Sequence, residues 1–495
     1  MTFEIVFVLL SLLGMVAALI ADKMRPGMIL FSVVVLFLCA GILTPKEMLE
    51  GFSNKGMITV ALLFLVSEGI RQSGTLGQVI KKLLPQGKTT VFKAQLRILP
   101  SVAFISAFLN NTPVVVIFAP IIKHWAKSVN LPATKFLIPL SYVTILGGIC
   151  TLIGTSTNLV VHGMILEAGF EGFSMFELGK VGIFIAIAGI IYIFLFSKRL
   201  LPDARPDTAV PDEEVEEGEK LHRVEAVLGA RFPGINKKLK DFNFQRHYGA
   251  EVKEIKTRNG QRFVTNLDDV VLHEGDTLVV MADDTFIPTW GESSVFVLLT
   301  NGNEPDTSGK KKRWFALLLL VLMIVGATVG ELPVTKEMFP DIKLDMFFFV
   351  SITTIIMAWT NLFPARKYTK YISWDILITI ACAFAISKAM VNSGVADSVA
   401  KFIIGLSDDY GPHVLLAMVF IITNLFTELI TNNAAAALAF PLALSISAQL
   451  GVSPTPFFVV ICMAASASFS TPIGYQTNLI VQGIGNYKFT DFVRI

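Results

Sequence analysis

Long apolar runs separated by short polar connections make up most of the chain, a pattern typical of a membrane protein with many helices. A helix needs about 20 apolar residues to cross a hydrocarbon core ~30 Å thick. Runs that approach or exceed this length predict spans at residues 4–20, 27–43, 56–72, 135–166 and 180–198 in the first half, and at 313–330, 345–362, 373–391 and 454–485 in the second.

Two further apolar segments, residues 97–127 and 413–450, are interrupted near their middles by small polar residues. The interruptions are Asn110-Asn111-Thr112 and Thr431-Asn432-Asn433. A broken backbone is tolerated at membrane depth only where protein buries it or where it lines a wet cavity. Each segment is therefore expected to form a re-entrant hairpin, whose two half-helices enter and leave on the same side of the membrane.

Each hairpin is followed, about forty residues later, by a second polar break, at residues 151–160 and 471–480. The motifs of the two halves lie 320 or 321 positions apart, and Ala61–Gly74 also aligns with Ala381–Gly394 at an offset of 320. Spans 135–166 and 454–485 are accordingly expected to be broken helices. Matched interruptions in two matched halves point to a transporter binding site.

A segment of different character separates the halves. Residues 201–220 form an acidic, proline-containing linker, residues 221–300 alternate apolar and polar positions as strands do, and residues 301–312 form a second linker. We therefore expect residues 221–300 to be a small soluble α/β domain. Residues 1–200 and 313–495 would be the N-terminal and C-terminal membrane repeats.

The distribution of Lys and Arg predicts the orientation. If residues 221–300 are cytoplasmic, five crossings precede them, and the cytoplasmic connections carry 14 basic residues against 6 on the external side. This bias agrees with the positive-inside rule. An odd number of crossings before the insert gives the two halves opposite orientations. The predicted fold is thus a polytopic α-helical membrane protein with an inverted repeat, two re-entrant hairpins and broken helices, plus the α/β insert, in the cell (inner or plasma) membrane.

Composition supports this class and excludes others. Of the 495 residues 53% are hydrophobic and 16% charged, and the mean hydropathy is +0.64. Soluble domains usually contain about 25% charged residues. The net charge of +2 gives no indication of a nucleic-acid partner, and the four cysteines stand singly without metal-ligand spacing. With no nucleophile–base constellation in the sequence, we do not expect an enzyme.

The polar breaks offer oxygen ligands for a cation and donors for an anion. Hard cations prefer oxygen ligands, and Ser, Thr and Asn side chains with freed carbonyls supply them without a fixed charge. Each half can build one such cage, from Ser106, Asn110, Asn111 and Gly154 in the first half and from Thr427, Thr431, Asn432 and Gly474 in the second.

The half-helices that begin after the breaks would point their N–H groups and positive dipole ends at one centre, which suits an anion. The residues placed to contact the anion are Asn111, Thr112, Thr155, Ser156, Thr157, Asn158, Asn432, Asn433, Tyr475, Gln476, Thr477 and Asn478. The alternative is that these residues only pack helices, as small polar residues often do in membranes. Four breaks in symmetric positions favour a binding site.

The tips resemble the paired Ser-Asn-Thr motifs of the divalent anion/sodium symporter family, which transports sulfate and dicarboxylates. Gly154, Thr155 and Asn158 match the helix breaks of that family. The resemblance implies a homodimer of elevator type that holds two sodium ions in the two cages. The chain departs from the family's Thr-Pro-Pro-Asn sequence, with Thr155-Ser-Thr-Asn158 in one half and Tyr475-Gln-Thr-Asn478 in the other.

The insert is similar to the C-terminal ligand-binding module of TrkA-type potassium transport regulators, through residues 239–242, 249–255 and 274–280. This resemblance implies a small regulatory ligand, nucleotide-like, on residues 221–300. A passive dimerisation role is the alternative. Three ionisable residues near the membrane are further candidates for function: Glu68, Lys388 and Glu428.

The sequence therefore predicts a sodium-coupled importer of a small divalent oxyanion, with sulfate first. A sodium/dicarboxylate symporter is the alternative within transport. A ligand-gated ion channel or a transporter-like sensor is the alternative from another class, since modules such as the insert also serve channels. A channel needs a continuous pore with several weak sites, whereas paired closed cages favour a carrier.

Overall fold

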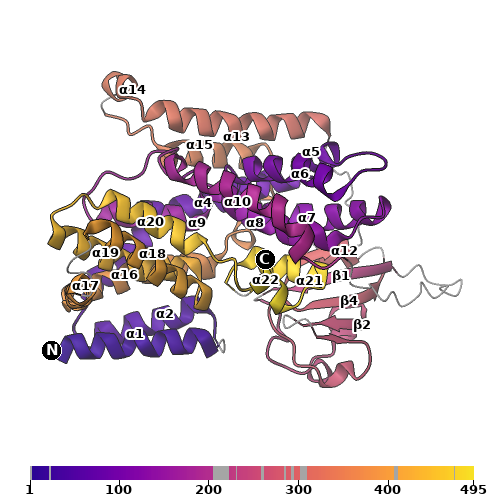
Figure 1. Cartoon of the computed structure of the whole chain (residues 1–495), viewed down its shortest axis with the longest axis horizontal. Helices are drawn as coiled ribbons and strands as arrows, with labels where there is room; N and C mark the ends of the chain where they lie inside the picture. Colours follow the sequence, from indigo (N-terminus) through magenta and orange to yellow (C-terminus); the bar gives the residue numbers. More distant parts are fainter. Residues whose placement is uncertain are drawn as a thin grey trace, which may run out of the picture.

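Most of the chain is helical in the computed structural model, with one sheet at the side of the helical part (Figure 1). The structure describes residues 3–21, 24–203, 222–229, 231–257, 261–283, 286–290, 295–300, 309–339, 341–405, 411–472 and 474–495. Most of both predicted linkers, 201–220 and 301–312, lies outside the described residues.

The helices of the two halves follow the same order along the chain. The first half contains α1 (Phe3–Ala21), α2 (Pro26–Cys39), α3 (Pro45–Glu50), α4 (Lys55–Gln72), α5 (Thr75–Leu83), α6 (Val91–Ser106), α7 (Asn111–Ser128), α8 (Leu137–Gly148), α9 (Ser156–Glu167) and α10 (Gly179–Leu200). The second contains α13 (Lys310–Gly330), α14 (Pro333–Met338), α15 (Met346–Trp359), α16 (Trp374–Asn392), α17 (Val395–Gly405), α18 (Pro412–Leu429), α19 (Asn432–Leu450), α20 (Thr455–Ser466), α21 (Gln476–Gly485) and α22 (Phe489–Arg494).

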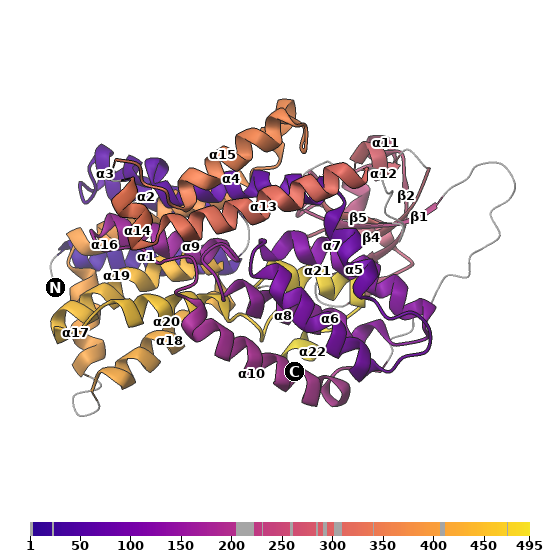
Figure 2. The same cartoon turned by 90° about the horizontal axis from the view of Figure 1, so that it is seen from above.

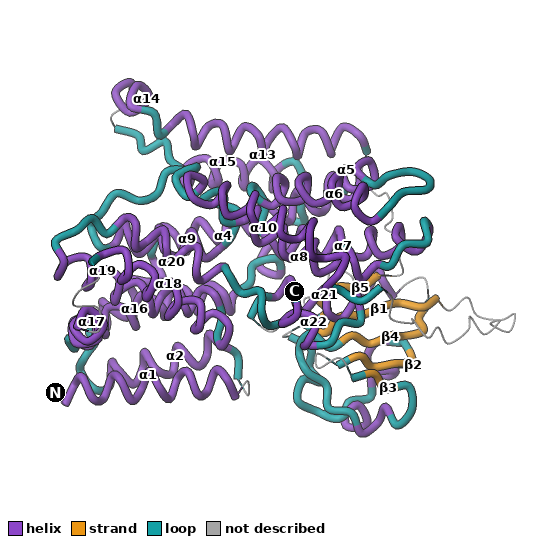
Figure 3. The backbone as a smooth tube through the Cα atoms, in the orientation of Figure 1, coloured by secondary structure: helices purple, strands orange, loops and turns teal. Residues whose placement is uncertain are grey.

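Helices end and restart at all four polar breaks (Figure 3). The chain leaves α6 and enters α7 at Asn111, and it leaves α18 and enters α19 at Asn432. Longer breaks separate α8 from α9 and α20 from α21. The re-entrant course of residues 97–127 and 413–450 stays a prediction, because helix boundaries do not locate the bilayer.

Among the described residues, seven helical segments are long and apolar enough to cross a membrane: α1, Pro45–Gln72, α10, α13, α16, α18 and α19. The predicted spans 27–43 and 345–362 were too long, because α2 and α15 have only 14 residues each. The chain turns after them, at Gly41 with φ +72° and at Asn361 with φ +52°. Left-handed residues at these positions end a helix.

The two halves interlock crosswise (Figure 2). α7 of the first half packs on α21 of the second, while α19 of the second packs on α9 of the first. Similarly, α2 packs on α16 and α15 packs on α4. Under the repeat, α7 corresponds to α19 and α21 corresponds to α9, so the first contact becomes the second when the two halves are exchanged. The contacts of α2 with α16 and of α15 with α4 are related in the same way, as a two-fold axis requires. The chain therefore has an internal pseudo-two-fold axis that relates its repeats.

The insert forms a five-stranded antiparallel sheet, which we call the sheet domain. Its strands are β1 (His222–Leu228), β2 (Glu251–Lys256), β3 (Arg262–Phe263), β4 (Thr277–Ala282) and β5 (Phe296–Thr300), in the order β3-β2-β4-β1-β5. The short helices α11 (Phe244–Tyr248) and α12 (Phe286–Trp290) belong to the same domain. One face of the sheet has its own core, rich in aromatic residues, which includes Phe232, Phe242, Phe244, Tyr248 and Phe296.

The opposite face of the sheet packs on the helical part of the molecule. Side chains alternate between the two faces of a strand, so Ala226 and Leu228 of β1 enter the domain core while Val227 enters the large helical core. β1 contacts α21, and β5 contacts α7. Gly483 of α21 allows this approach, since a Cβ there would lie 2.3 Å from Thr277 Oγ1 of β4. The sheet domain is thus fixed to the far ends of two half-helices.

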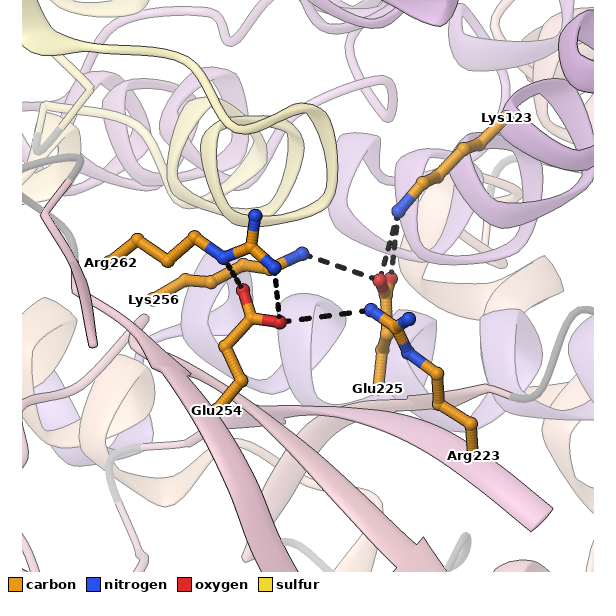
Figure 4. Close-up of polar contacts among 6 residues, drawn as sticks. All are labelled: Lys123, Arg223, Glu225, Glu254, Lys256 and Arg262. Atoms are coloured by element: carbon orange, nitrogen blue, oxygen red, sulfur yellow. Dashed lines mark hydrogen bonds and ion pairs between the residues drawn. The ribbon is translucent and has the colours of Figure 1, made fainter. Parts of the chain in front are cut away.

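An ion cluster reinforces this contact (Figure 4). Lys123 of α7 donates to both carboxylate oxygens of Glu225 at 2.9 and 3.1 Å, and Lys256 Nζ lies 3.5 Å from the same group. Glu254 accepts from Arg262, with Arg223 at 3.8 Å. Burial of Glu225 opposes ionisation, but Lys123, Lys256 and Arg223 more than offset it and hold its pKa at about 2.

Replacing Lys123 by Ala should weaken the attachment of the sheet domain. The Glu225 carboxylate would lose its main partner in a mostly buried position, at a cost of about 1–3 kcal/mol. Thermal unfolding of the purified protein in detergent measures the loss. The matched control is Lys253→Ala, which removes an exposed pair with Glu251 whose contribution is about 0–1 kcal/mol. Equal unfolding midpoints for the two variants would contradict this assignment.

The same pair predicts a pH dependence. The folded pKa of Glu225 lies below its ordinary value of 4.5, so its contribution to stability is complete above that value and is lost as the pH falls toward 2. Lys123→Ala should therefore reduce the pH dependence of unfolding between about pH 4.5 and 2. A series of unfolding midpoints at acid pH, compared with those of Lys253→Ala, tests this expectation.

Candidate functional site

The N-termini of four half-helices meet near the centre of the helical part. Thr112 Oγ1 at the start of α7 donates to Gln476 Oε1 at the start of α21, at 3.2 Å. Thr157 Oγ1 in the first turn of α9 donates to Asn433 Oδ1 in the first turn of α19, also at 3.2 Å. The crosswise packing of the halves therefore brings all four polar breaks together, as expected for a shared site.

Tyr475 joins these pairs. It is buried, and its hydroxyl lies 3.1 Å from Thr155 Oγ1 and 2.6 Å from the side-chain amide of Asn111. The side chain of Asn432 lies near this hydroxyl. Thr155 and Tyr475 are 320 positions apart and so correspond under the repeat. The axis that exchanges two equivalent residues passes between them when they touch each other. This contact therefore places the pseudo-two-fold axis at the site.

The first cage surrounds the other end of the Asn111 amide, which is fully buried. Three oxygen atoms converge on it: Ser106 Oγ at 2.9 Å, the Gly154 carbonyl at 3.2 Å and the Thr144 carbonyl at 3.1 Å. The hydrogen bonds at both ends of the amide are satisfied when its NH2 group points toward these oxygens and its carbonyl accepts from Tyr475. The set of neutral oxygens fits a monovalent cation if the amide presents its oxygen instead.

The second cage lies between α18 and the break before α21. Thr427 Oγ1 lies 2.8 Å from Asn432 Oδ1 and 2.6 Å from the Ala465 carbonyl, although a hydroxyl has only one proton to donate. A Cβ at Gly474 would lie 1.8 Å from Ser468 Oγ and 3.1 Å from the Thr427 carbonyl. Buried oxygens that have no hydrogen-bond partner gather around this break: Thr431 Oγ1, Ser466 Oγ and Ser468 Oγ. Such oxygens fit the coordination of a cation.

Three of the residues expected to contact the anion have their side chains engaged with other protein groups. The NH2 group of Asn158 donates to the carbonyls of Gly148 and Thr151, and that of Asn478 donates to the equivalent carbonyls of Ser468 and Thr471. These two amides therefore hold the break loops in shape. Thr477 is fully buried against Ser141, whose hydroxyl donates to it at 2.9 Å.

The remaining expected residues lie at the edges of the site. Asn110 and Ser156 are partly exposed, and both line a mostly apolar pocket to which α4 and α13 also contribute. Gln476 is exposed. The tip between α6 and α7 therefore faces a pocket that is also lined by α4 and α13, which are not among the four half-helices.

Two of the three ionisable candidates, Glu428 and Glu68, have structural partners. Glu428 accepts from the Ser470 N–H at 3.0 Å and from Thr471 Oγ1 at 2.7 Å, so it supports the break before α21. Glu68 pairs with Arg71 at 2.7 Å, and Lys388 is exposed. In the described part of the chain no group of three His, Cys, Asp or Glu could hold a metal ion. The cages consist instead of uncharged oxygens.

Sequence reasoning missed several contributors. The Thr144 carbonyl belongs to the middle of an apolar helix, and no motif marks it. Ser466 and Ser468 stand in a run of small residues, Ala464-Ala-Ser-Ala-Ser468, directly before the break. Small polar residues at the end of an apolar helix were the available signal for these two.

Comparisons with known proteins identify the family. The model of the citrate transporter family, CitMHS, matches residues 16–457 and, in a second match, 338–494. "Uncharacterized transporter sll0640" of Synechocystis is 30% identical over 94% of this chain and 89% of its own length. "Probable sodium/sulfate cotransporter 3" of Chlamydomonas reinhardtii is 23% identical over 96% of this chain and 84% of its own. "Sodium/sulfate cotransporter 2" of the same alga is 31% identical over 55% of this chain and 30% of its own.

The helical architecture and these matches lead to one conclusion. The chain is an integral membrane protein, and it belongs to the citrate transporter family.

Proposed function

We propose that this protein is a secondary active transporter that couples sodium to the import of a small divalent oxyanion, with sulfate as the leading substrate. The observation that carries the proposal is the meeting of four half-helix N-termini between two oxygen cages, with Tyr475 bonded to the asparagine of the first cage. The names of the sodium/sulfate cotransporters that resemble the chain agree with this substrate.

The anion would be held by neutral donors. Neither hairpin tip and neither helix break contains Lys or Arg. Each helix N-terminus contributes about 0.3–1 kcal/mol toward an anion, so four supply roughly 1–4 kcal/mol. Desolvating an ion costs several kcal/mol. Two sodium ions in the adjacent cages would offset much of the remainder, because charges interact strongly where the effective dielectric constant is low.

The residues proposed to bind sodium are those of the two cages: Ser106, Asn111, Gly154 and Thr144 in the first half, and Thr427, Thr431, Asn432, Ser466, Ser468 and Gly474 in the second. The anion would meet Thr112, Thr155, Ser156, Thr157, Asn433, Tyr475 and Gln476. Asn158 and Asn478 are left out of the anion site because their amides hold the break loops, and Thr477 because it is buried against Ser141. Asn110 is left out of the first cage because it is partly exposed and lines the neighbouring pocket.

The transport mechanism that fits the interlocked halves is an elevator, in which the four half-helices move as one body within a homodimer in the cell membrane. The crosswise contacts of α7 with α21 and of α9 with α19 support it. The sheet domain would lie in the cytoplasm and bind a small regulatory ligand. Counter-substrate exchange in proteoliposomes separates this carrier from a ligand-gated channel.

The second candidate substrate is a carboxylate, such as a dicarboxylate or citrate. The description of the matching family favours it. The same cages would serve it, because they bind the cation rather than the anion.

Replacing either cage asparagine should uncouple transport from sodium. Asn111→Ala and Asn432→Ala each remove an amide at the centre of a cage, and sodium-stimulated uptake should fall at least about tenfold, a loss of about 1.4 kcal/mol in cation binding. Uptake of labelled anion with sodium or with choline measures the effect. Asn392→Ala, which removes a similar amide that bonds to Ile42 and Glu47 far from the cages, is the control. Normal sodium stimulation in both cage variants would exclude these sodium sites.

Competition for uptake identifies the anion. Unlabelled sulfate should inhibit the sodium-dependent uptake of labelled sulfate more strongly than succinate or citrate does. The reason is that the short side chains at the four N-termini offer closely spaced donors, which suit a compact tetrahedral anion. Stronger inhibition by succinate or citrate would establish the carboxylate alternative.

A further inference from the structure

The hydroxyl of Tyr475 contacts the first cage and the break of α9 at once, and it lies near the second cage. Its neighbours are the amide of Asn111 at 2.6 Å, Thr155 Oγ1 at 3.1 Å and the side chain of Asn432. A hydroxyl has one proton and two lone pairs. Tyr475 can therefore donate to only one of these three neighbours at a time.

The Asn111 amide has two orientations with the same atom positions and opposite chemistry. With its NH2 group toward Ser106, Gly154 and Thr144, the amide shares its two protons among three oxygens, and its carbonyl accepts the proton of Tyr475. With its oxygen toward them, the amide accepts from Ser106 Oγ, but its oxygen faces the Gly154 and Thr144 carbonyls with no proton between them, an arrangement that a cation would stabilise. The NH2 group then donates to the Tyr475 oxygen at 2.6 Å. Cation binding therefore selects the second orientation.

Each orientation fixes the direction of the next hydrogen bond. In the cation-free state the proton of Tyr475 belongs to Asn111, so Thr155 donates to Tyr475. In the cation-bound state Tyr475 accepts from Asn111 and can turn its proton to Thr155, which releases the Thr155 proton. Thr155 precedes the first turn of α9, and its side chain makes no capping bond there. Its released proton is available at the N-terminus of α9.

We propose that Tyr475 is a positioning residue that transmits occupation of the first cage to the anion site, by reversing its hydrogen bond with Thr155. This inference rests on the proposed function, since it specifies how a cation and an anion at that site would be coupled. The repeat supplies no second copy of this relay: the residue that corresponds to Tyr475 is Thr155 itself. A single side chain on the pseudo-two-fold axis would therefore serve both halves.

The test compares anion affinity in sodium with anion affinity in choline, using uptake by proteoliposomes that contain the full-length protein. Tyr475→Phe keeps the ring and removes the hydroxyl, which leaves the Thr155 proton available in both conditions. We expect affinity in choline to rise relative to wild type, so that the sodium-to-choline ratio falls about fivefold or more. Thr155→Val removes the donor itself, and we expect affinity in sodium to fall while affinity in choline changes little.

Tyr142→Phe is the matched control. Tyr142 is also buried and donates to the carbonyl of Phe469 in a break loop at 2.6 Å, so its removal perturbs packing without touching the relay. We expect it to keep the wild-type ratio. A wild-type ratio in Tyr475→Phe, or an equal fall in Tyr142→Phe, would overturn the relay. If Tyr475→Phe does not fold, Thr155→Val tests the relay alone. A loss of anion affinity in sodium but not in choline would support the relay, and an equal loss in both would overturn it. Sodium-independent affinity in the wild type would overturn the proposed function itself.

Discussion

A helix that stops inside an apolar environment leaves backbone N–H and carbonyl groups with no water to satisfy them. The described part of this chain interrupts its apolar helices at the four polar breaks, and the backbone groups of each break need other partners. Asn158 and Asn478 supply them in the same way, each through two hydrogen bonds to carbonyls of its own break. Glu428 accepts from the Ser470 N–H and from Thr471 Oγ1, and Thr151 Oγ1 donates to the Ala107 carbonyl. The breaks are therefore stable features around which the other helices are arranged.

Symmetry makes the four interruptions a single site. Each break lies beside a helix of the opposite half, and neither half could complete the arrangement alone. The same symmetry leaves one position on the axis, where Thr155 meets Tyr475. A residue on the axis need not have an identical partner, and here it does not. The difference between Thr155 and Tyr475 therefore affects how the two halves contact each other and leaves the composition of each cage unchanged.

The sequence was informative where chemistry is local. Asn and Gly motifs in apolar surroundings located all four breaks, because burying a polar cluster costs free energy unless its groups find hydrogen-bond partners or ligands. The lengths of α2 and α15 were overestimated, since hydropathy does not register the left-handed turns at Gly41 and Asn361. The carbonyl of Thr144 and the contact between Asn111 and Tyr475 could not be predicted from the sequence. They join segments up to 364 positions apart, whose approach depends on the packing of the whole molecule.

The attachment of the sheet domain to two half-helices has a thermodynamic consequence. It rests on α7 and α21, whose opposite ends frame the candidate anion site. If those helices change position during transport, the domain changes position with them. Any molecule that binds the domain more tightly in one position must favour that position by the same factor, and the transported ions must alter the affinity of that molecule in return. A domain placed there is linked to the transport cycle through its position alone, without a contact of its own to the ions.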